Sequence, residues 1–121
     1  MPPAVVDEYL GSRVSEETVR DFWNAGMAAS LHATRACVLS WLEDFTADLE
    51  RVDVPTLIIH GSADRILSVE GQGHRLRDTL PDARYVEVEG GPHLTPVSHA
   101  ADVSRELAGF LGHTATLDAT A

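Results

Sequence analysis

One segment, residues 54–61, restricts the possible folds of this chain more than any other. Pro55 is followed by an uninterrupted apolar run, Leu-Ile-Ile at residues 57–59. Such a run is typical of a strand covered on both faces, and proline is tolerated at the first position of a strand. Residues 84–88 alternate in polarity and form a second predicted strand, with a helix predicted between the two at residues 69–80. Two strands joined through a helix should be parallel, so the sequence predicts an α/β fold from residue 54 onward.

The part of the chain before this region is predicted to be mainly helical. An irregular lead-in at residues 1–13 precedes Ser15, a typical N-cap, and helices are predicted at residues 15–29 and 31–43. Both helices carry apolar side chains at helical spacing, which we expect to form a helix-packing core rather than to line a ligand pocket. These side chains are Val19, Phe22, Trp23, Met27, Leu31, Val38, Leu39, Trp41 and Leu42.

The sequence after the second strand predicts one more helix, at residues 97–111. Residues 113–121 are mostly small and are predicted to form a disordered tail. We therefore divide the chain into a helical region at 1–45, a strand-containing core at 46–112 and a tail at 113–121.

Length and composition exclude several classes of protein. The 121 residues are few for an α/β enzyme with a full sheet, which typically needs roughly 200–250 residues. Nine basic and nineteen acidic residues give a formal charge of −10, and such a surface repels nucleic acid and anionic lipid. The single cysteine, Cys37, excludes an internal disulfide and a multi-cysteine metal site. Neither a signal peptide nor a membrane-spanning apolar run is evident, so we expect a cytoplasmic protein.

Two loops that directly follow the predicted strands carry residues suited to acid–base chemistry. Residues 60–65 include Asp64, and residues 89–93 end in His93. Because the carboxyl ends of parallel strands meet at one edge of a sheet, we expect these two side chains to project from the same edge. A carboxylate there can fix the tautomer of the imidazole and stabilise the imidazolium ion that forms when the imidazole accepts a proton. The sequence therefore predicts an acid–histidine pair made of Asp64 and His93.

The pattern HGxxD after a buried strand, followed by GxPH after the next strand, resembles the acid and histidine loops of α/β-hydrolases. Within that superfamily the chain is most similar to the cofactor-free haloperoxidase or perhydrolase group, also described as non-haem chloroperoxidase-like. The similarity covers about residues 9–111 and includes the segments Arg13–Arg20, Asp44–Leu49, Val52–Pro55, Leu80–Ala83, Tyr85–Gly90 and Ser98–Ala100. It implies that the chain is the C-terminal part of an α/β-hydrolase fold. Cap helices would come first, followed by the last two parallel strands of an incomplete sheet with their flanking helices.

By this resemblance Asp64 matches the acid and His93 the base of a Ser-His-Asp triad. It implies acyl transfer to water or to hydrogen peroxide, with a small acyl or ester substrate and no cofactor or metal. The nucleophile of the family is a serine in the pattern G-x-S-x-G. None of the serines here lies in that pattern, at positions 12, 15, 30, 40, 62, 68, 98 and 104, and the oxyanion-hole loop is missing too. Ser68 stands where a proline is common in the family, and Leu94 where a glycine often follows the histidine.

Other polar residues are weaker candidates. We interpret His99 as a structural or capping residue, His60 as a backbone-positioning residue and Ser62 as a poor nucleophile. The spacing of Asp64, His93 and His99 matches no compact metal signature.

Three hypotheses follow. We favour a partial hydrolase, inactive alone and active with a complementary N-terminal half. The alternatives are a non-catalytic remnant of a hydrolase and a small interaction domain that oligomerises through its open sheet edge.

Overall fold

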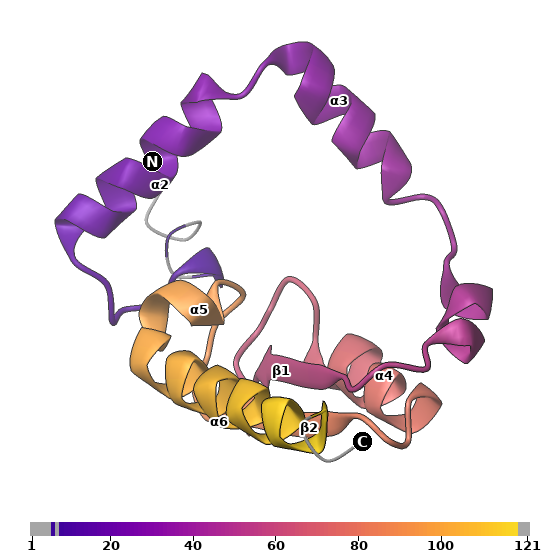
Figure 1. Ribbon diagram of the computed structural model, residues 1–121. Coiled ribbons are helices and arrows are strands. Elements are labelled where there is room, and N and C mark those ends of the chain that lie inside the picture. The colour runs from indigo at the N-terminus through magenta and orange to yellow at the C-terminus, as the bar shows by residue number, and fades with distance from the viewer. Residues whose placement is uncertain (1–5, 7, 119–121) are drawn as a thin grey trace.

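The sheet of this protein contains two parallel strands, β1 (Leu57–Gly61) and β2 (Arg84–Val88). The computed structural model describes residues 6 and 8–118, with side chains described as far as residue 112 (Figure 1). The strands pair from Leu57 opposite Arg84 to Gly61 opposite Val88. β1 begins two residues after Pro55, which has no N–H to donate to a ladder. The predicted parallel α/β arrangement with an incomplete sheet is confirmed.

Side chains of the strands alternate between two helical layers. Leu57 and Ile59 face the last helix, α6 (Ala100–Asp118), and line a cavity together with its apolar side chains. His60 faces the opposite side, where the connection between the strands packs against its ring. The buried apolar side chains of the described region are Leu10, Ile58, Val69 and Val88.

The connection between the strands differs from the single helix predicted at 69–80. It consists of a π-helical turn, η2 (Val69–Gly73), followed by α4 (His74–Thr79). The Ser68 hydroxyl caps η2 by accepting a hydrogen bond from the Gly71 N–H at 3.1 Å. Glycine weakens regular helix formation, and the two glycines of η2 account for the irregular first turn.

The C-terminal region contains two helices where one was predicted. The short α5 (Thr95–Ser98) is separated from α6 by His99, whose backbone leaves the helical range at φ −124° and ψ 38°. α6 continues to Asp118, so the backbone of residues 113–118 is helical where a disordered tail was predicted. No proline or glycine follows Gly112, and extending an existing helix costs little once it has formed. Residues 119–121 of the predicted tail lie outside the described residues.

The helices before the sheet form where the sequence predicted them. α2 (Glu16–Ala28) is capped by Ser15 and α3 (Leu31–Ser40) by Ser30, each through a hydroxyl that accepts a backbone N–H. A 3-10 helix, η1 (Thr46–Arg51), then leads toward β1. Of the predicted irregular lead-in, Tyr9 belongs to a helical turn, whereas residues 1–5 and 7 lie outside the described residues.

The apolar side chains of α2 and α3, and of Trp41 directly after α3, do not form the predicted packing core. Neither helix buries a residue, and the exposed fractions are 45% for Trp23 and 77% for Trp41. Figure 1 shows why: α2 and α3 form an arch that leads away from the layer of β1 and β2. Helical spacing specifies an apolar face but not the element that covers it; in the described chain the Phe22 ring meets that of Tyr9, with 6.0 Å between centroids, while Trp23 and Trp41 stay exposed. None of the helices that the structure describes is both long and apolar enough to cross a membrane.

Candidate active site

The predicted acid and histidine lie side by side at the carboxyl edge of the sheet. β1 ends at Gly61 and β2 at Val88, so the loops that follow leave from the same edge. His93 Nδ1 is 2.9 Å from Asp64 Oδ2. The structure thus brings together the two site residues that the sequence singled out.

Direct contact between the two loops fixes this arrangement. The Ala63 N–H donates to the Gly91 carbonyl at 2.9 Å, and the Gly90 N–H donates to Ser62 Oγ at 2.8 Å. Gly61 makes the approach possible, because a Cβ there would lie 2.6 Å from the Gly91 carbonyl carbon. Gly61 and Gly91 therefore allow the two loops to approach closely, because neither residue has a Cβ.

Asp64 is held as a carboxylate. Its Oδ1 accepts the N–H groups of Ile66 and Leu67, both at 2.8 Å, and its side chain is 6% exposed. Burial by itself would raise the pKa of Asp64. The hydrogen bonds from Leu67, His93 and Ile66 outweigh burial, so the pKa lies below the ordinary value for aspartate. An ionised carboxylate only accepts hydrogen bonds, so His93 carries its proton on Nδ1 and its Nε2 is left as the basic nitrogen.

Tyr9 supports the histidine loop from the lead-in. Its ring meets the His93 ring edge-on, with 5.4 Å between centroids, and its carbonyl accepts the Leu94 N–H at 2.7 Å. Tyr9 could not be identified from the sequence, because nothing in the spacing of an N-terminal segment indicates contact with a residue more than eighty positions away.

The remaining candidates are engaged elsewhere. Ser62 Oγ accepts the Gly90 N–H and so ties the two loops together. His99 is buried with its Nδ1 2.9 Å from Ser98 Oγ, and its Nε2 has no partner within the described part of the chain. His60 Nε2 is 2.9 Å from the Leu67 carbonyl. In the residues described, no group of three or more His, Cys, Asp or Glu side chains is arranged to hold a metal ion.

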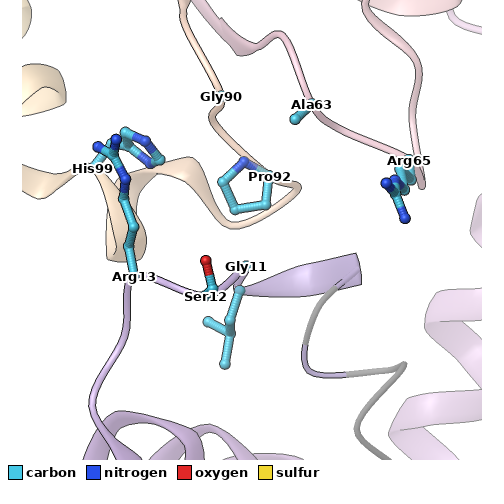
Figure 2. Close-up of a pocket in the computed structure, with 9 residues that line it drawn as sticks. Gly11, Ser12, Arg13, Ala63, Arg65, Gly90, Pro92 and His99 are labelled. Atoms are coloured by element: carbon cyan, nitrogen blue, oxygen red, sulfur yellow. The ribbon is translucent and has the colours of Figure 1, made fainter.

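Several cavities adjoin the loops, and Asp64 and His93 line one of them. That cavity, of about 580 Å³, is lined by Asp64 and His93 and by apolar side chains of β1 and α6. A second cavity, of about 370 Å³, lies between the Gly90–Pro92 turn and residues 10–13, and its lining includes neither Asp64 nor His93. Figure 2 shows Arg13 beside His99 at one end of this second cavity and Arg65 at the other. The acid–histidine pair therefore lies on the α6 side of the sheet.

Comparisons with known proteins agree with this geometry. No protein-family model matches the chain. A putative non-heme chloroperoxidase from Synechocystis sp. is 46% identical over 106 residues, which are 88% of this chain and 38% of that protein. The bifunctional esterase/perhydrolase DCH of Acinetobacter calcoaceticus is 28% identical over 84% of this chain and 37% of its own length.

A solved structure extends the comparison to three dimensions. Bromoperoxidase from Bacillus anthracis superposes with a TM-score of 0.80 at 32% identity, over 90% of this chain and 43% of that one. The chain thus spans about two fifths of the length of the relatives it matches. It belongs to the α/β-hydrolase superfamily and corresponds to the C-terminal part of the non-heme haloperoxidase and perhydrolase group.

Proposed function

We propose that this chain supplies the acid and the histidine of a serine hydrolase of the esterase and perhydrolase type. Asp64 is the acid and His93 the base. The observation that carries the proposal is the 2.9 Å contact between His93 Nδ1 and Asp64 Oδ2 at the carboxyl edge of a parallel sheet. Relatives named as haloperoxidases and as an esterase/perhydrolase support the same reaction class.

The proposed chemistry is acyl transfer through a serine ester. Asp64 accepts a hydrogen bond from the Nδ1–H of His93 and stabilises the imidazolium ion that forms when Nε2 of His93 removes the proton of the serine hydroxyl. The same nitrogen then returns that proton to the leaving alcohol. In the second half of the reaction it activates water, which gives a carboxylic acid, or hydrogen peroxide, which gives a peracid.

In this proposal, the serine and the oxyanion donors are supplied by a polypeptide segment other than the 121 residues of this chain. None of the eight serines of the sequence lies in G-x-S-x-G. Ser62, the serine nearest to Asp64 in sequence, already uses its oxygen to accept the Gly90 N–H. The matched relatives are more than twice as long as the aligned region, so an N-terminal part of the hydrolase fold is the natural source.

The surface beside β1 is suited to bind an N-terminal part of the hydrolase fold. Among the described residues β1 pairs with β2 on one edge, and no described strand pairs with its other edge. Next to it lies the 580 Å³ cavity, whose α6 side includes Leu107 at 46% and Leu111 at 56% exposure. A parallel strand added to β1 would pair this edge and cover these side chains, as expected for strands buried on both faces.

A homo-oligomer is the second candidate, because the same open edge can pair with a copy of itself. In that case the chain is an interaction domain or a remnant without activity. The two candidates differ in what the chain requires: the hydrolase needs a different polypeptide segment, whereas the interaction domain needs only a second copy.

A fusion protein tests the proposal. The part of the Synechocystis relative that precedes the aligned region is joined in front of this chain, and hydrolysis of p-nitrophenyl acetate is measured. We expect the fusion to hydrolyse the ester and the chain alone to be inactive. The intact relative, assayed in parallel, is the reference. A fusion that is monodisperse and folded by circular dichroism, yet inactive beside an active relative, would overturn the proposal. A folded homodimer of the chain alone whose dimerisation excludes the N-terminal part would favour the second candidate.

A further inference from the structure

The His60 ring occupies an enclosed position next to the acid loop. Its side chain is 13% exposed and lies on the face of β1 that η2 covers. A Cβ at position 73 would lie 3.0 Å from both Cγ and Nδ1 of the ring and 3.0 Å from Tyr85 Oη. Glycine at position 73 therefore leaves the space that the imidazole fills, and the ring has little freedom to turn.

Hydrogen bonds connect this ring to the carboxylate of Asp64 through the backbone of Leu67. His60 Nε2 is 2.9 Å from the Leu67 carbonyl oxygen, which can only accept. Nε2 therefore carries the proton of the neutral ring. The N–H of Leu67 in turn donates to Asp64 Oδ1 at 2.8 Å. Both polar backbone groups of Leu67 are thus engaged, one by His60 and the other by Asp64.

The same ring nitrogen also lies beside the second carboxylate oxygen. The distance from His60 Nε2 to Asp64 Oδ2 is 3.6 Å, and Oδ2 is the oxygen that contacts His93. The N–H of His60 therefore points into the region between the Leu67 carbonyl and the reactive side of the carboxylate. Because Nε2 is already protonated and bonded, His60 is not available there as a general base.

We infer that His60 is a positioning residue for Asp64, an inference that rests on the proposed function of the Asp64–His93 pair. Its imidazole fixes the Leu67 peptide groups, the Leu67 N–H fixes Oδ1, and Oδ2 is thereby aimed at His93. Removal of the His60 donor leaves the Leu67 carbonyl without the hydrogen bond that holds it. Asp64 then loses a backbone donor that lowers its pKa and loses its fixed orientation.

Two substitutions separate this function from simple packing. The amide nitrogen of glutamine reaches about as far as Nε2 of histidine, whereas that of asparagine reaches only as far as Nδ1. His60→Gln therefore keeps a donor for the Leu67 carbonyl, and His60→Asn does not. Gly73→Ala is a second perturbation, because it displaces the ring while leaving His60 and Asp64 unchanged. His32→Asn on the exposed helix α3 is the matched control.

The first readout requires no enzyme activity. The pKa of Asp64 is measured in the chain by carboxyl ¹³C NMR titration, and the tautomer of His60 by ring ¹⁵N NMR. We expect a His60 protonated on Nε2, and an Asp64 pKa that rises toward its ordinary value in His60→Asn and Gly73→Ala. His60→Gln and His32→Asn should leave the Asp64 pKa close to that of the unsubstituted chain. An unchanged pKa in His60→Asn, an equal rise in His60→Gln, or a His60 protonated on Nδ1 would each overturn the inference.

The second readout uses the fusion described above. Misplacing a catalytic group by about 1 Å can cost on the order of 100-fold in rate. We therefore expect kcat for p-nitrophenyl acetate to fall about 10- to 100-fold in His60→Asn, with KM little changed and with recovery in His60→Gln. If every fusion is inactive, the proposed function fails, and the Asp64 pKa in the chain still decides the inference about His60.

Discussion

The contact between the two site loops at Gly61 leads to a sharp prediction for Gly61→Ala. The new Cβ would lie 2.6 Å from the Gly91 carbonyl carbon, whereas ordinary contacts begin at 3.4 Å. The obstacle is backbone, so the two loops must separate by about 1 Å, and overpacking of this kind costs about 1–3 kcal/mol of unfolding free energy. The same displacement pulls Asp64 away from His93, which are 2.9 Å apart. Gly61→Ala should therefore lose both stability and the acid–histidine contact.

Urea unfolding of the chain measures the first effect, and the pKa of Asp64 by NMR measures the second. Gly26→Ala is the matched control, because a Cβ there meets nothing within 4 Å and the position is inside helix α2. Alanine is favoured over glycine in a helix interior by about 1 kcal/mol, so this control should be neutral or stabilising. If Gly61→Ala unfolds at the same urea concentration as the unsubstituted chain and keeps a depressed Asp64 pKa, the steric reasoning is refuted.

Three further predictions concern polar groups around the site. Ser62→Ala removes the acceptor of the Gly90 N–H, a hydrogen bond that joins the two site loops, and should cost about 1 kcal/mol in urea unfolding; an unchanged unfolding free energy would contradict this function of Ser62. His99→Phe removes a buried Nε2 that has no partner in the described region and also the hydrogen bond between Nδ1 and Ser98 Oγ; because the two effects oppose each other, the unfolding free energy should change by less than about 1 kcal/mol. A larger loss of unfolding free energy would indicate that Nε2 of His99 has a hydrogen-bond partner. Asp64 has a lowered pKa, so its carboxylate stabilises the fold above the ordinary aspartate pKa of about 4, and this contribution disappears as the pH falls through the lower folded value. Asp64→Asn should remove that part of the acid dependence in urea unfolding between about pH 5 and pH 2, and an identical dependence in both proteins would contradict the assignment.

The strands and the site pair could be predicted from the sequence because local signals and topology agree there. The apolar run at 57–59 and the alternation at 84–88 mark the two strands, which form at 57–61 and 84–88. Once they are parallel and adjacent, the residues that follow each strand must meet at one edge. Asp64 is therefore expected near His93, and the structure places His93 Nδ1 2.9 Å from Asp64 Oδ2.

Features that depend on distant contacts could not be predicted in this way. Tyr9 meets His93 only because the lead-in returns to the histidine loop. The enclosure of the His60 ring depends on Gly73, which in the sequence looks like a weak point in a helix. The apolar spacing in α2 and α3 indicated a core, yet these helices bury no residue, because spacing along one helix does not specify what packs against it.

The effect of His93→Ala on ester hydrolysis by the fusion tests the central claim most directly. If His93 is the base that activates the serine, kcat for p-nitrophenyl acetate should fall on the order of 1,000-fold or more, as when a triad histidine is removed. His32→Ala on the exposed helix α3 is the control and should leave kcat unchanged. A His93→Ala fusion whose kcat stays within about three-fold of the unsubstituted fusion would contradict the account, because the base would then be some other group.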